Sequence, residues 1–136
     1  MRLVADANVL LSAVIGGQSK TVLEHPRVET VVTTAVTFAE VQEYAGHLAQ
    51  KKRLDLELVL LAVAALPVAI VPREQYQDAL PRARGKIGKR DPDDIEILAL
   101  AMHLGWPLWS NDNDFEAAGV EWYTTAELLQ RLKAAE

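Results

Sequence analysis

The 136-residue sequence predicts an α/β fold in which helices cover both faces of a parallel sheet. Short runs with strand character alternate with longer helical patterns along the whole chain. Half of the residues are hydrophobic, so a chain of this length can bury a substantial core. We therefore expect a single domain spanning residues 1–136.

The first half of the chain predicts strands and helices in alternation. The strand Arg2–Ala5 leads into the helix Asn8–Gly16, which Gly16 and Gly17 close. Apolar runs and helical spacing then predict a short helix at Lys20–His25, a strand at Val31–Thr34, helices at Thr37–Gln50 and Leu54–Leu66, and a strand at Val68–Val71.

The second half continues the alternation. Helix Pro92–Leu104 has the clearest boundaries, with Asp91 as N-cap, Pro92 at the first helical position and Gly105 as its stop. The other predicted elements are a helix at Gln75–Ala83, a basic loop at Arg84–Arg90, strands at Leu108–Ser110 and Glu121–Tyr123, and a final helix at Thr125–Ala134.

Composition excludes several classes of protein. The absence of Cys rules out disulfides and thiolate metal sites. The net charge of −5 and the pI of about 5.2 argue against a broadly basic nucleic-acid binder. Residues 51–53 and 82–90 nevertheless carry eight of the fourteen Lys and Arg, in stretches without an acid. No segment resembles a membrane span or a secretion signal, so we expect a soluble cytoplasmic protein.

Four acids are predicted to lie at the carboxyl ends of strands or at the start of the next helix, where ligands bind in such sheets. Asp6 follows the first strand, and we expect it to be available for function because Asn8 can cap the next helix. Glu40 borders the apolar stripe of its helix, although a capping box with Thr37 also explains it. Asp112 and the nearby Asp114 follow the strand at Leu108–Ser110, where an ordinary polar turn is the alternative.

The fourth acid comes from the adjacent Asp91, Asp93 and Asp94. On a helical wheel Asp94 is in line with the apolar residues of its helix, whereas Asp93 is in line with Glu96 and closer to solvent. The wheel therefore favours Asp94, whose charge above a core stripe needs a cation. Carboxylates gathered at one sheet edge suit Mg²⁺ or Mn²⁺, which prefer oxygen ligands.

The ordered set of motifs resembles the PIN-domain family of metal-dependent ribonucleases, and most of all the VapC-type toxins of toxin–antitoxin pairs. The resemblance covers nearly the whole chain. Its motifs are "VADANVL" with Asp6, "TFAEV" with Glu40, "DIEILALA" with Asp94, and "WSNDNDF" with Ser110, Asp112 and Asp114.

The resemblance implies a PIN-like three-layer α/β/α sandwich with a central parallel sheet, and an endonuclease that hydrolyses RNA phosphodiester bonds with Mg²⁺ or Mn²⁺. Asp6, Glu40, Asp94 and Asp112 would be catalytic, and Asp6, Asp94, Asp112 and Asp114 would hold the metal. Asn8 and Ser110 would support the site or contact substrate. The basic residues expected on the RNA backbone are Arg82, Arg84, Lys86, Lys89 and Arg90. A cognate antitoxin and a homodimer are the implied protein partners.

Other functions fit the sequence less well. A phosphatase of the haloacid-dehalogenase type needs an Asp at position 8, where this chain has Asn8. A response-regulator receiver needs a late Lys at a strand end, and "GGQSKT" at residues 16–21 lacks the first Gly of a P-loop. A non-catalytic RNA- or protein-binding module on the same fold remains the main alternative.

Overall fold

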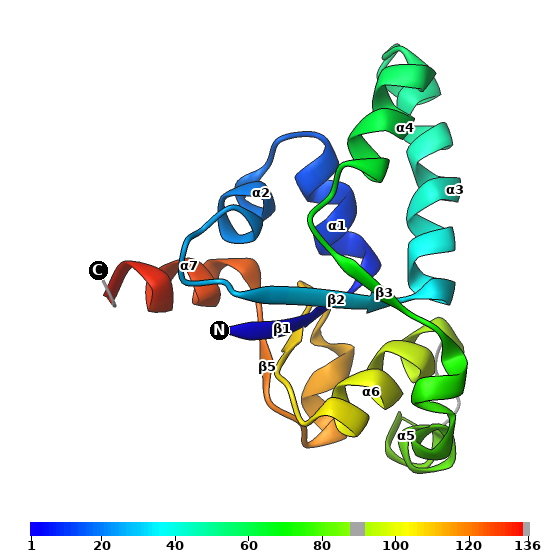
Figure 1. Ribbon diagram of the computed structural model, residues 1–136, viewed down its shortest axis with the longest axis vertical. Helices are drawn as coiled ribbons and strands as arrows, with labels where there is room; N and C mark the ends of the chain where they lie inside the picture. The colour runs from blue at the N-terminus through cyan, green and yellow to red at the C-terminus, as the bar shows by residue number, and fades with distance from the viewer. Residues whose placement is uncertain (88–91, 135–136) are drawn as a thin grey trace.

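The computed structural model describes residues 1–87 and 92–134 and contains a five-stranded parallel sheet (Figure 1). The strand order is β3-β2-β1-β4-β5, so the first strand of the chain is the central one. Every pair of neighbouring strands is parallel. The strands are β1 (Arg2–Ala5), β2 (Thr30–Thr34), β3 (Ala69–Val71), β4 (Leu108–Trp109) and β5 (Trp122–Tyr123).

Helices lie on both faces of this sheet, as the sequence predicts (Figure 1). One layer consists of α1 (Ala7–Val14), α2 (Gln18–Leu23), α3 (Ala35–Lys51), α4 (Leu56–Ala64) and α7 (Thr125–Ala134). The other layer consists of α5 (Leu80–Ile87) and α6 (Pro92–Leu104), with the 3₁₀ turns η1 (Arg73–Gln75), η2 (Gln77–Ala79) and η3 (Asn113–Ala118). The fold is therefore a PIN-like α/β/α sandwich.

The central strand is buried on both of its faces. Leu3, Val4 and Ala5 are fully buried. Leu3 and Ala5 pack under α1 and α2, while Val4 packs under α6, because successive side chains of a strand point to opposite faces. Coverage of the parallel sheet on both sides thus explains why the central strand is continuously apolar from Leu3 to Ala5.

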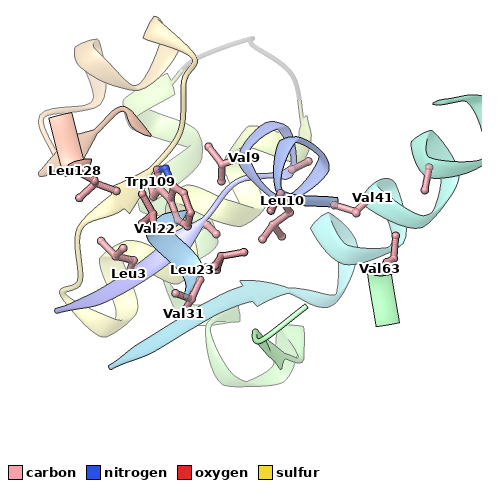
Figure 2. Packing of buried hydrophobic residues seen from close by; sticks show 14 of the residues in the cluster. Leu3, Val9, Leu10, Val22, Leu23, Val31, Val41, Val63, Trp109 and Leu128 are labelled. Atoms are coloured by element: carbon pink, nitrogen blue, oxygen red, sulfur yellow. The ribbon is translucent and has the colours of Figure 1, made fainter. Parts of the chain in front are cut away.

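Two apolar cores stabilise the sandwich. Figure 2 shows the first, in which Leu10, Val22 and Trp109 belong to one cluster between the sheet and the α1 layer. The second core surrounds α6, whose residues from Ile95 to Ala101 are all buried. Burial of each Ile or Leu side chain contributes roughly 1.5–3 kcal/mol to folding, so these residues hold α6 firmly against the sheet.

Several predicted boundaries are wrong. The expected helix Gln75–Ala83 is instead η1 and η2 followed by α5, and α5 continues through Ile87 where a loop was expected. Positions 88–91, with the proposed cap at Asp91, lie outside the described residues. Gly105 ends α6 as predicted, with a φ of 68° that favours glycine.

Helix α3 begins earlier than predicted. Thr34, the last residue of β2, is its N-cap and accepts a hydrogen bond from the backbone N–H of Thr37 at 2.8 Å. The capping box of Thr37 with Glu40 is therefore wrong, because Thr37 is already inside the helix.

Helix α4 exposes much of its apolar surface. Leu56, Leu58, Leu60 and Leu61, which we call the leucine face, are all exposed, and Leu58 and Leu61 each retain 64% of their accessible surface. Across the described part of the chain, no helix has the combination of length and hydrophobicity that crossing a bilayer requires.

Candidate metal centre

The site begins where the neighbouring strands β1 and β4 end. Asp6 directly follows β1 and Ser110 directly follows β4, and the Asp6 N–H donates to the Trp109 carbonyl at 3.0 Å. The Asp6 side chain is only 8% exposed. It caps α1 by accepting a hydrogen bond from the Ala7 N–H at 2.8 Å, so the expectation that Asn8 caps this helix is wrong.

Ser110 connects the two strand ends. It is fully buried, and its hydroxyl donates to Asp6 Oδ2 at 2.8 Å. Ser110 Oγ also accepts hydrogen bonds from the Asp112 N–H at 3.0 Å and from Asn8 Nδ2 at 3.2 Å. Asp6 is therefore linked to the loop of Asp112 through one hydroxyl group.

Two asparagines fix the path of that loop. Asn8 Oδ1 accepts from the Asn111 N–H at 3.2 Å, and Asn111 Oδ1 accepts from the Thr125 N–H at 2.9 Å. The Thr125 hydroxyl in turn accepts from Trp109 Nε1 at 3.0 Å. These bonds join α1, the loop after β4 and the first turn of α7, so the loop has little freedom to move.

Three carboxylates come together beside this network. Oxygen atoms of Asp94, Asp112 and Asp114 all lie within 4.8 Å of one another, and we call these residues the acid triad. Asp94 is in the first turn of α6. Asp112 caps η3 and accepts from the Asp114 N–H at 2.9 Å, which holds the last two acids close together.

The acid triad fits a hard divalent cation. All of its donors are carboxylate oxygens, the ligands that Mg²⁺ and Mn²⁺ prefer. Two oxygens on opposite sides of a Mg²⁺ ion lie about 4.2 Å apart, so a small approach of the carboxylates suffices to share one ion. An ion also offsets the mutual repulsion of three negative charges.

The other predicted site residues do not all belong to the acid triad. Within the described residues, Asp6 and Glu40 are not members of the acid triad. Glu40 is half-buried on the second turn of α3, the helix that follows β2. Arg82, Arg84 and Lys86 are exposed along α5, whereas Lys89 and Arg90 lie outside the described residues.

A buried carboxylate escaped the sequence analysis. Glu96 on α6 is 8% exposed, so the expectation that it faces solvent is wrong. It accepts from Arg73 Nε at 2.8 Å and from the Tyr76 hydroxyl at 2.8 Å. Burial and the bond to Glu96 raise the pKa of Tyr76 to about 12. The sequence offered one signal of its burial, because Glu96 is the one acid within the apolar run that follows Asp94.

Comparison with known proteins identifies the family. The family model described as "PIN domain" matches residues 4–133, which is almost the entire chain. The chain belongs to the PIN-domain family. A comparison of this PIN domain with curated protein sequences finds no match.

Solved structures share the fold of this PIN domain. PAE2754 of Pyrobaculum aerophilum has a TM-score of 0.77 at 17% identity, covering 98% of this chain and 96% of that one. A chain of a toxin–antitoxin complex from Klebsiella pneumoniae has a TM-score of 0.65 at 23% identity, covering 90% and 97%. VapC20 of Mycobacterium tuberculosis, a toxin that cleaves the sarcin-ricin loop, has a TM-score of 0.59 at 17% identity, covering 87% and 95%. Toxins of toxin–antitoxin complexes are therefore structural neighbours of this PIN domain.

Proposed function

We propose that this PIN domain is a metal-dependent endoribonuclease that hydrolyses RNA phosphodiester bonds as the toxin of a toxin–antitoxin pair. The observation that carries the proposal is the acid triad, formed by α6 and the loop after β4 at the carboxyl edge of the sheet. Membership of the PIN-domain family and the likeness to VapC20 support it.

Each residue of the site has a proposed role. Asp94, Asp112 and Asp114 hold Mg²⁺ or Mn²⁺, and Asp6 joins them as a ligand or catalytic carboxylate oriented by Ser110. When bound, the ion supplies positive charge to the phosphate oxygens and lowers the pKa of a water molecule. Glu40 is proposed as a further catalytic acid.

The neighbouring polar groups keep the carboxylates in position. The Ser110 hydroxyl donates its one hydrogen bond to Asp6, and its two lone pairs accept from the Asp112 N–H and from Asn8 Nδ2. Asn8 also orients the backbone of Asn111. This support shell holds ligands from two distant chain segments in one arrangement, as metal sites require.

A cleavage assay tests the proposal. The parent protein should cleave single-stranded RNA with Mg²⁺ or Mn²⁺ and lose activity in EDTA. Asp94→Asn should lower the cleavage rate by at least about 100-fold, because it removes a ligand where support residues alone are worth about 10- to 100-fold. The matched control is Glu116→Gln, an exposed acid on η3 outside the acid triad, which should cleave like the parent.

Three outcomes would contradict the proposal. Cleavage that survives EDTA would reject the metal, and equal loss in both variants would remove Asp94 from the site. RNA binding without cleavage would favour the non-catalytic module. Hydrolysis of a phosphate monoester without RNA cleavage would favour a phosphatase.

The proposed partners are RNA, a cognate antitoxin and a second copy of this chain. The toxin–antitoxin complex from Klebsiella pneumoniae, with a similar fold, supports the antitoxin. The leucine face of α4 supports a protein interface, because contiguous exposed apolar surface is uncommon on monomers. We assign this face to the homodimer.

A further inference from the structure

A cavity of about 440 Å³ lies between α3, η1, α5 and α6. Its apolar walls come from Val36, Leu80 and Ile95, and Pro92 adds to them. Its charged groups are Arg73, Arg84 and Glu96. The volume falls within the range of roughly 300–1,000 Å³ that is usual for small-ligand sites.

The cavity shares α6 with the acid triad, and it shares α3 with the proposed catalytic residue Glu40. Ile95 directly follows Asp94 in the first turn of α6, and Val36 lies one helical turn before Glu40 on α3. Both helices begin at the carboxyl edge of the sheet or beside it. An RNA strand bound at the acid triad could therefore place a neighbouring nucleotide in this cavity.

The charges of the cavity suit a phosphate group. Glu96 raises the pKa of Arg73 above its ordinary value, so this guanidinium stays protonated. Arg73 uses its Nε to donate to Glu96, and a guanidinium carries four further N–H groups on its terminal nitrogens. With Arg84 added and Glu96 subtracted, the lining has a net positive charge.

The walls suit a flat ring. Apolar side chains and guanidinium planes both stack on nucleobases, and such stacking is tolerant of sequence. The Arg73 guanidinium is held in place by the buried Glu96, so less entropy is lost when it binds. A phosphate beside an apolar ring is the chemistry of a nucleotide.

We propose that this cavity binds a nucleotide flanking the cleaved bond of the RNA substrate, with its base against Val36 and Leu80 and its phosphate on Arg84 and Arg73. The inference rests on the proposed ribonuclease function and adds a substrate subsite to it. It also separates Arg84, which lines the cavity, from Arg82, which shares α5 but does not line it.

Binding without cleavage provides the first test. A short single-stranded RNA oligonucleotide is titrated into the protein in EDTA, and backbone amide shifts are followed by heteronuclear NMR. The shifts should concentrate on the amides around Val36, Leu80 and Ile95. Arg84→Gln should weaken the affinity about tenfold, the usual value of a charge-assisted hydrogen bond. It should also reduce the salt slope by about 0.7, the value of one phosphate contact.

Two further variants sharpen the test. Arg27→Gln removes the same charge from an exposed residue in the turn before β2, outside the expected RNA contacts, and should bind like the parent. Val36→Phe fills the cavity without changing its charge and should also weaken binding. The Arg84 side chain is exposed, so its replacement leaves the fold intact even if Val36→Phe proves unstable.

The cleavage assay distinguishes failure of the subsite from failure of the ribonuclease function. With Mg²⁺, Arg84→Gln should raise KM about tenfold, with kcat nearly unchanged. If the parent cleaves RNA but Arg84→Gln and Arg27→Gln behave alike, the subsite is wrong and the ribonuclease function stands. If the cavity amides shift on RNA but nothing is cleaved, RNA binding by the cavity is supported, whereas the ribonuclease function and the flanking of a cleaved bond are rejected. Shifts confined to other surfaces overturn the subsite.

Discussion

Ser110 shows how one side chain can determine the geometry of a site. Its hydroxyl is buried and has partners on Asp6, Asn8 and Asp112. A serine at this position places an Asp from the start of the chain next to acids from its last third. Alanine here would leave the buried Asp6 oxygen and the part-buried Asp112 N–H without this partner, and the loss typically costs about 1–3 kcal/mol for a buried group.

Asp112 gives a prediction for stability. In EDTA, Asp112→Asn should melt at a higher temperature than the parent, because it removes one charge from the acid triad while Asn still caps η3. Added Mg²⁺ should raise the melting temperature of the parent more than that of the variant, since a ligand stabilises only the state that binds it. Thermal melts of both proteins, with Glu116→Gln as control, measure this. Equal shifts with Mg²⁺ would exclude Asp112 from the metal site.

At the scale of elements, the start of α6 has two functions. Asp94 belongs to the acid triad. Glu96, two residues later, joins α6 to the segment after β3 through hydrogen bonds with Arg73 and Tyr76. Because Tyr76 is fully buried, this tie is shielded from water. It helps to fix the helix that presents Asp94.

The sequence predicts this element only in part. The apolar periodicity of Pro92–Leu104 correctly predicts its bounds, because propensity, N-terminal proline and C-terminal glycine agree. The wheel fails for Glu96, because a helix buried nearly all round has no solvent face to which an acid can be assigned. The early start of α3 was also missed, since Thr34 serves both as the end of β2 and as a cap.

Tyr76 gives a prediction for alkaline pH. An unfolded chain releases this proton near pH 10, whereas the folded protein holds it until about pH 12. The folded state therefore binds more protons in this window, and the free energy of unfolding should fall by roughly 2–3 kcal/mol as the pH rises through it. Tyr76→Phe should be less stable than the parent at pH 9, and the difference should shrink by pH 12.

Urea unfolding at several pH values between 9 and 12 measures the effect of Tyr76. The control is Tyr44→Phe, which alters an exposed ring on α3. A constant stability difference between the parent and Tyr76→Phe across this range would show that the buried hydroxyl does not contribute to the pH dependence.

At the scale of the molecule, the acid triad and the leucine face lie in different parts of the fold. The acid triad is at the carboxyl edge of the sheet, while the leucine face lies on α4 in the opposite helix layer from α6 (Figure 1). The parallel sheet and its layers follow from alternating apolar patterns, so this scale was the most predictable. The meeting of Asp94 with Asp112 and Asp114 depends on tertiary packing that no local pattern encodes.

The leucine face gives a prediction for assembly. Parent protein at micromolar concentration should elute as a homodimer, and the double variant Leu58→Gln with Leu61→Gln should shift toward monomer, because it removes the two most exposed side chains of this face. Size-exclusion chromatography with light scattering measures the mass. Ile70→Gln, an exposed apolar residue on β3, is the control and should remain dimeric. A monomeric parent, or dissociation by the control alone, would reject α4 as the interface.

The hydrogen bond between Ser110 and Asp6 spans 104 positions of the chain, and this has a consequence for biosynthesis. At roughly 5–20 residues per second, Asp6 leaves the ribosome several seconds before Ser110 is even polymerised. A nascent chain that stops short of β4 lacks the central strand's second neighbour and two members of the acid triad. Under the proposed function, a nascent chain that ends before Asp112 cannot assemble the acid triad, and it therefore lacks the proposed metal site. An inhibitor of the proposed activity is then needed only after Asp114 has been synthesised, rather than from the start of translation.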